Sequence, residues 1–142
     1  MDMRDKAVHY LVAIKMREVG IYRLADHGHH YNKDWFIPFD YCYDPEDPSE
    51  HMYWETELNN SNEDRISRLV KAPHQASLRN WLREYQEIDI EIIRHNDRKY
   101  RAKVGKDKMR SVTEDRKVKV FEEYYDAMDS ALLQALSLLP EF

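Results

Sequence analysis

Two neighbouring segments, IDIEIIRH at 88–95 and RKYRAKVG at 98–105, carry an apolar residue at every second position. A period of two is that of a β-strand with one buried face, and the polar NDR stretch at 96–98 favours a turn between two such strands. A slip of one residue would turn every side chain to the wrong face, so the apolar alternation also predicts the register of an antiparallel hairpin. The predicted pairs are Ile90 with Val104, Glu91 with Lys103 and Ile92 with Ala102, around a three-residue loop.

Helical patterns lie on both sides of this hairpin. Pro73 suits the first turn of a helix, and the apolar residues that follow at i, i+3, i+4 and i+7 spacing are Leu78, Trp81, Leu82 and Tyr85. The segment 125–139 repeats apolar residues with helical periodicity up to Pro140. Between the hairpin and this helix we expect a polar connection at 105–116 and a third short strand at KVKVF, 117–121.

The pattern predicts an α+β fold in which a small antiparallel sheet has helices packed on one face. The length of 142 residues suits a single domain, 1–142. In this domain, 1–71 would supply an N-terminal helix and an aromatic, proline-rich segment, and 72–142 would form a core of order α-β-β-β-α. The expected core residues are Trp81, Leu82, Ile90, Ile92, Val104, Leu132 and Leu136.

The first half of the chain has a less regular pattern. Apolar residues at helical spacing predict a helix over about 4–18, with Gly20 as its stop signal. The aromatic segments 34–43 and 51–58 favour a hairpin, because the proline- and aspartate-rich stretch between them is typical of a turn. Residues 61–70 suggest one or two helical turns after a cap at Asn62, with Val70 on their apolar face.

The composition excludes several classes of protein. The net charge of −5 gives no overall attraction to nucleic acid or to an anionic membrane. Three glycines leave no room for the glycine-rich loops of P-loop or dinucleotide-binding sites, and one cysteine cannot form an intrachain disulfide. The apolar stretch near the N-terminus is too short and too charged for a membrane span or a signal sequence, so we expect a cytoplasmic location without a membrane partner.

The helix APHQASLRNWLREYQ, together with the alanine- and leucine-rich final helix, resembles a family of small uncharacterised bacteriophage and prophage proteins. The matching residues of the first helix are Pro73, His74, Gln75, Leu78, Trp81, Leu82, Arg83 and Glu84, and His74 stands where the family pattern has threonine. The opening segment VAIKMREVG is also similar, and the likeness covers about half the chain. The resemblance implies an accessory protein acting in the cytoplasm of a bacterial host; it implies no particular activity.

Aromatic residues gather between prolines and acids in the middle of the chain. Such mixtures are typical of interface anchors, although the same rings could cover the sheet as part of the core. We therefore expect a non-enzymatic protein that binds a host or phage protein, and homo-oligomers remain open. The candidate contact residues are Trp35, Phe36, Tyr41, Tyr43 and Trp54.

A basic run at 94–110 raises the alternative of nucleic-acid binding. The order helix, three strands, helix is that of a double-stranded-RNA-binding domain, but acids occupy the start of the final helix, where such domains need basic residues. Tyr100 shares its face with the core, so stacking on a base is not favoured. The candidate contacts are Arg98, Arg101, Lys106, Lys108 and Arg110.

Three histidines, His27, His29 and His30, raise a third alternative, a metal-dependent enzyme. Asp26, Asp34 or Cys42 could complete a ligand shell. The spacing matches no defined metal motif, and a solvated polar loop is the favoured interpretation. We expect no cofactor.

Overall fold

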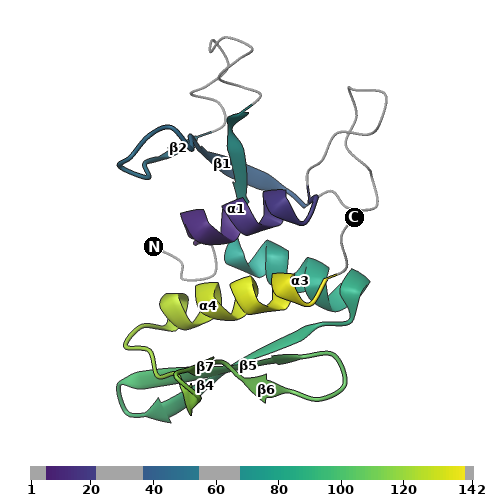
Figure 1. Ribbon diagram of the computed structural model, residues 1–142, viewed down its shortest axis with the longest axis vertical. Helices are drawn as coiled ribbons and strands as arrows, with labels where there is room; N and C mark the ends of the chain where they lie inside the picture. The colour runs from purple at the N-terminus through teal and green to yellow at the C-terminus, as the bar shows by residue number, and fades with distance from the viewer. Residues whose placement is uncertain (1–5, 22–36, 55–67, 140–142) are drawn as a thin grey trace.

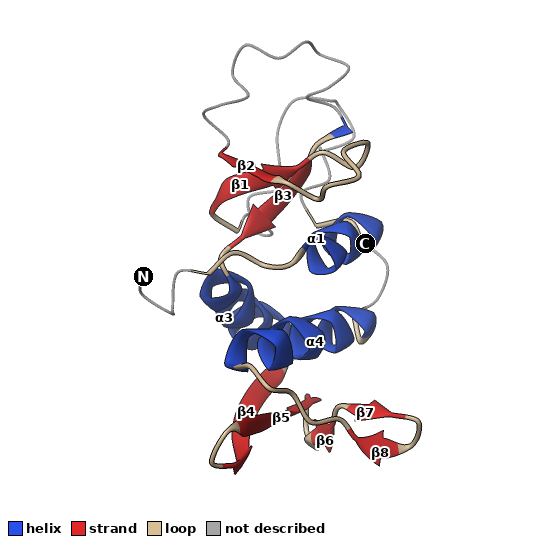
Figure 2. Cartoon of the chain, turned by 90° about the vertical axis from the view of Figure 1, so that its left-hand side faces the viewer, coloured by secondary structure: helices blue, strands red, loops and turns tan. Residues whose placement is uncertain are grey.

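The computed structural model describes residues 6–21, 37–54 and 68–139. These residues form three helices and small antiparallel sheets, which confirms the predicted α+β class. Figure 2 shows the helices as a layer between two sheets, each built from three strands. Within these ranges no helix has the length and apolar character needed to cross a bilayer.

The hairpin predicted at 88–105 forms most of one three-stranded sheet, of order β4-β5-β6, which we call the second sheet. Strand β4 (Asp89–Asn96) pairs antiparallel with β5 (Lys99–Gly105), and all three predicted residue pairs are confirmed. The loop prediction is wrong by one residue, because Asn96 pairs with Lys99 and leaves a two-residue turn. A bulge between Arg94 and Asn96 absorbs the extra residue.

The third strand of this sheet differs from the prediction. Strand β6 (Arg110–Ser111) pairs with β5, so the segment 105–116 is not merely a connection. The chain then leaves the sheet in a small hairpin of β7 (Thr113–Glu114) and β8 (Lys117–Val118), and Phe121 returns to bridge Tyr100. The predicted strand at 117–121 is therefore wrong in its pairing, because β8 pairs with β7 and only Phe121 reaches β5.

The helices of the second half lie close to their predicted positions, α3 at Gln75–Gln86 and α4 at Tyr124–Ser137. The predicted core is confirmed as buried, except that Ile92 is only partly buried. Two details are wrong. Pro73 ends strand β3 (Val70–Pro73) and does not enter the helix, and Tyr85 is 67% exposed instead of joining the apolar stripe.

Helix α1 (Tyr10–Glu18) begins later than predicted. Residues before it are extended, since Ala7 bridges His74 and the Val8 N–H donates to the Pro73 carbonyl at 2.9 Å. The predicted stop at Gly20 is confirmed, because Gly20 adopts φ 93° and its N–H donates to Arg17.

The first sheet has the order β2-β1-β3 (Figure 1). Strand β1 (Phe39–Tyr43) pairs with β2 (Met52–Trp54), which confirms the predicted hairpin over the described residues. Strand β3 was not predicted, and Val70 lies in it instead of on a helical face. Of the predicted helical turns, residues 61–67 lie outside the described residues.

Candidate functional site

Three rings from neighbouring segments form a row across the first sheet. Trp54 lies opposite Tyr41, with ring centroids 4.5 Å apart and an angle of 44° between the planes. The ring of His74, which directly follows β3, meets the Tyr41 ring edge-on at 5.7 Å and 75°. Tilted and edge-on contacts of this kind stabilise aromatic pairs, so the three side chains restrict one another. We call Trp54, Tyr41 and His74 the aromatic row.

The outer end of the aromatic row is exposed. Trp54 keeps 51% of its surface exposed although it stacks on Tyr41. Met52, on the same face of β2, is also exposed. Tryptophan, tyrosine and methionine are enriched at protein interfaces, and a ring already held by a neighbour loses little conformational freedom on binding. The row therefore has the chemistry of an interface anchor.

The inner end of the row carries an acid. The Nε2–H of His74 donates to Asp40 Oδ2 at 3.1 Å, and Asp40 is largely exposed. His74 occupies the N-cap position of α3, but its side chain makes no capping bond to the helix. Its ring is thus oriented by Asp40 and Tyr41, which gives the row a polar, negatively charged border.

The other aromatic residues predicted as contacts are placed differently. Tyr43 is buried, its hydroxyl donates to the Val8 carbonyl at 2.9 Å, and its ring meets Tyr10 edge-on. Burial, with the nearby charges of Asp129 and Glu50, raises the pKa of Tyr43 to about 12. Tyr43 is a core residue. Trp35 and Phe36 lie outside the described residues.

Two aspartates in the turn between β1 and β2 are already hydrogen-bonded. Buried Asp44 accepts from Arg68 Nε at 3.0 Å and Nη2 at 3.1 Å. Asp47 accepts from the Ser49 hydroxyl and N–H and from the Tyr53 hydroxyl, and these bonds lower its pKa. This acidic turn is ordered by its own contacts, as expected for a structural turn.

The basic residues proposed to contact nucleic acid fall into separate groups. Arg98 lies in the turn before β5, whereas Lys106 and Lys108 lie in the turn after it, roughly 20 Å away along the strand. Arg101 is half-buried on β5, and Arg110 lies on β6. Tyr100 is unsuited to stacking on a base, because it pairs with Phe121 and packs against α4. The structure brings these five residues into one sheet but not into one patch.

The histidine cluster is not placed. His27, His29 and His30 lie outside the described residues, so a metal site there stays a prediction. In the ranges that are described, no three potential ligands of the His, Cys, Asp and Glu types come together. Cys42 is buried in β1.

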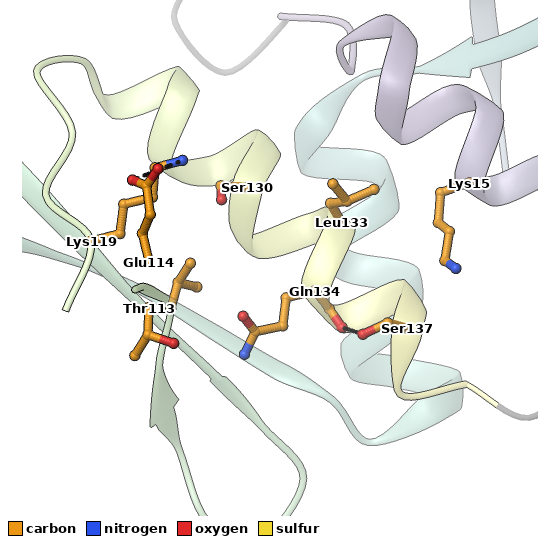
Figure 3. Close-up of a pocket in the computed structure, with 9 residues that line it drawn as sticks. Lys15, Thr113, Glu114, Lys119, Ser130, Leu133, Gln134 and Ser137 are labelled. Carbon is orange, nitrogen blue, oxygen red and sulfur yellow. Dashed lines mark hydrogen bonds and ion pairs between the residues drawn. The ribbon is translucent and has the colours of Figure 1, made fainter. Parts of the chain in front are cut away.

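A shallow groove of about 510 Å³ runs beside α4 (Figure 3). Gln134 points into the space between α4 and the strands, and Lys119 forms an ion pair with Glu114 at 3.8 Å. The lining offers hydroxyl, amide and ammonium groups to a polar ligand. The residues that line the groove are Lys15, Val112, Thr113, Glu114, Lys119, Ser130, Leu133, Gln134 and Ser137.

Sequence reasoning missed a polar junction between the helices. Asp129 of α4 accepts from the His9 N–H at 3.0 Å and bonds to the side chain of Gln75. Gln75, itself buried, donates to the Tyr125 carbonyl at 3.1 Å. Burial raises the pKa of Asp129, although these bonds and Lys6 oppose the rise. The junction connects the starts of α1 and α3 to α4, and no local pattern could have revealed it.

Comparisons of this chain with protein-family models, with curated proteins and with solved structures found no match. The assignment of a function therefore rests on the geometry described above.

Proposed function

We propose that this protein is non-enzymatic and acts by binding another protein through the aromatic row. The observation that carries the proposal is that Trp54, on the edge strand β2, is half-exposed while its ring contacts the ring of Tyr41 on the neighbouring strand. Anchors of this type dominate binding energy when they enter a pocket on the partner. Exposed Met52 extends the apolar surface along the same strand.

The border of the row indicates what kind of partner fits. Asp40 lies at one end, and the turn beside β2 carries the exposed carboxylate of Glu50 and the partly buried carboxylate of Asp47. These acids would repel a phosphate backbone, and they complement a partner whose apolar pocket is flanked by lysine or arginine. A protein partner with a basic rim is therefore favoured at this surface.

The resemblance to phage and prophage proteins supports a setting for this activity. The matching helix is α3, with Trp81, Leu82, Arg83 and Glu84 in succession. On this basis the protein is an accessory protein of a bacteriophage or prophage, acts in the cytoplasm of the bacterial host, and binds a host or phage protein.

The test uses capture from a lysate of the bacterium that carries the gene, followed by affinity measurement with the purified captured protein. Trp54→Ala should weaken the affinity by about 2 kcal/mol or more, roughly thirtyfold. Tyr85→Ala is the matched control, because Tyr85 is an exposed aromatic residue on α3, away from the row. Equal binding by wild type and Trp54→Ala would contradict the proposal.

One observation favours nucleic-acid binding as a second candidate. Lys99, Arg101 and Lys103 alternate along β5 and so share the face of the second sheet opposite to core residue Ala102. Such a line of cations suits contact with phosphates. Binding that falls steeply with salt and is lost when Arg98, Arg101 and Lys106 are neutralised would support this candidate. Binding indifferent to both would end it.

A further inference from the structure

Strand β4 is an edge of the second sheet, because the strand order is β4-β5-β6. With eight residues it is the longest strand in the described ranges, and it contains neither proline nor glycine. Proteins usually shorten, kink or cover such edges, since their unpaired backbone groups bind other strands. Here the single irregularity is the bulge that follows Arg94 near the end of the strand.

The hydrogen bonds of β5 show which residues of β4 face this edge. Tyr100 exchanges two bonds with Phe121, and the Ala102 carbonyl accepts from the Val112 N–H. The backbone N–H and C=O groups of the even-numbered residues of β5 are therefore directed toward the third strand, and those of its odd-numbered residues bond to β4. In the register of β4 and β5, odd-numbered residues lie opposite odd-numbered ones and even-numbered residues opposite even-numbered ones. The backbone groups of the odd-numbered residues of β4 therefore bond to β5, and those of its even-numbered residues face the outer edge of the sheet.

The outward-facing residues are thus Ile90, Ile92 and Arg94. One of their backbone carbonyls already accepts a hydrogen bond, because Arg79 Nη2 donates to the Ile90 carbonyl at 2.6 Å. No hydrogen bond from the described part of the chain reaches the edge-facing N–H and C=O groups of Ile92 and Arg94. At the middle of the strand, these backbone groups are therefore unpaired as far as the described residues are concerned.

The charges of β4 point to its partner. The strand reads DIEIIRHN, so its first half is acidic, its second half is basic, and Ile92 and Ile93 lie between. Its charged side chains are exposed. An antiparallel copy of the same strand would lay each acidic half against a basic half, whereas a parallel copy would oppose like charges. We propose that β4 pairs antiparallel with β4 of a second copy of this chain.

The hydrogen bond from Arg79 to the Ile90 carbonyl indicates the register in which the two β4 strands would pair. Pairing centred on Ile92 would need that carbonyl, and pairing centred on Glu91 would oppose two carboxylates. Pairing centred on Ile93 uses only the free groups, because Ile92 then bonds to Arg94 of the second copy. It also places the two Ile93 side chains directly opposite each other.

This pairing goes beyond the proposed function and does not depend on it. The second sheet and the first sheet, which carries the aromatic row, lie on opposite sides of the helices (Figure 1). A dimer through β4 would therefore leave both aromatic rows open and present them twice. The two surfaces can be tested separately.

Sedimentation equilibrium of the full chain over about 1 µM to 1 mM tests the pairing, since a single strand pair is a small interface. The expected result is a rise from 17.2 kDa to twice that mass. Arg94→Pro removes an edge N–H that bonds to nothing in the described chain and should raise the dissociation constant roughly tenfold or more. Arg94→Ala, which keeps the N–H, is the matched control and should still dimerise.

Ile93→Lys provides a second variant in case Arg94→Pro fails to fold, because Ile93 lies on the sheet face away from the helices. It would place two cations opposite each other in the dimer and should also give monomers. The proposal is overturned if the wild type stays monomeric across the range, or if folded Arg94→Pro and Ile93→Lys dimerise as well as wild type.

Discussion

The two three-stranded sheets in the described part of the chain are assembled in different ways. In the second sheet, β4 and β5 follow each other directly, and apolar residues at every second position set their register. In the first sheet, β1 pairs with β2 on one side and with the distant β3 on the other, with a register shift between Phe39 and Tyr41. Buried polar contacts stabilise this sheet, including the bond from Tyr43 to Val8. Regular alternation specifies a sheet locally, whereas pairing between distant segments relies on individual contacts.

The largest expected effect tests whether the two sheets depend on one core. Leu132 is fully buried in α4, which contacts α1, α3 and the second sheet. Leu132→Ala should lower the free energy of unfolding by about 3 kcal/mol, because the cavity costs stability beyond the lost burial. Both sheets should unfold in one urea transition, followed by tryptophan fluorescence and circular dichroism.

The control for this variant is Leu138→Ala, since Leu138 is exposed. Its unfolding free energy should stay within about 0.5 kcal/mol of wild type. Two separate transitions, of which only one shifts in Leu132→Ala, would show that the sheets are independent.

The next effect tests the polar stabilisation of the first sheet. Arg68→Ala removes the ion-pair partner of buried Asp44, which keeps its hydrogen bond from the Glu46 N–H, and should destabilise the protein by about 2 kcal/mol, a value reduced because Arg68 is partly exposed. Arg83→Ala is the matched control, because Arg83 makes a longer, exposed contact of 3.7 Å with Asp89 of the second sheet. Thermal unfolding should separate the two variants, and equal losses would remove the contrast between the sheets.

A smaller effect concerns Lys71 on β3, for which burial lowers the pKa to about 8 from its ordinary 10.5. Between these two values the unfolded chain binds more protons than the folded one, so stability should rise with pH across this window. Lys71→Met should therefore stabilise the protein by about 1 kcal/mol at pH 7, a value well below that of the full pKa shift because solvent screens the partly exposed Lys71, and the gain should vanish above pH 10.5. Denaturant unfolding at several pH values measures this, and a gain that persists above the window would exclude the charge as its cause.

The smallest effect belongs to the outer face of the second sheet. Glu91 and Lys103 are directly opposite in the register, and Glu91 is exposed. A double-mutant cycle with alanine at both positions should give a coupling of about 0.5 kcal/mol or less. A coupling comparable to the loss in Arg68→Ala would mean that charge pairs stabilise both sheets equally.

The sequence predicted the parts of the fold that are encoded by near neighbours. The β4–β5 register, the buried stripe of α4, the stripe of α3 apart from Tyr85 and the stop at Gly20 are confirmed. The hairpin β7–β8 was missed because Asp115 and Arg116 both adopt positive φ, a requirement usually met by Asn-Gly or Asp-Gly. Strand β3 was missed because only its pairing with β1 makes it a strand.

For the candidate site, composition named Trp54 and Tyr41, but it could not separate them from Tyr43. All three are aromatic residues of predicted strands, and Tyr43 is buried only because Val8 and Tyr10 come to lie against it. His74 joined the row only once β3 placed it beside Tyr41. The sequence by itself determined the α+β class, the helices and the hairpins β1–β2 and β4–β5, because periodicity and turn chemistry act over a few residues. The tertiary structure alone decided which rings are exposed, which strand lies at the edge of a described sheet and where Asp129 is buried, because these depend on which distant segments meet.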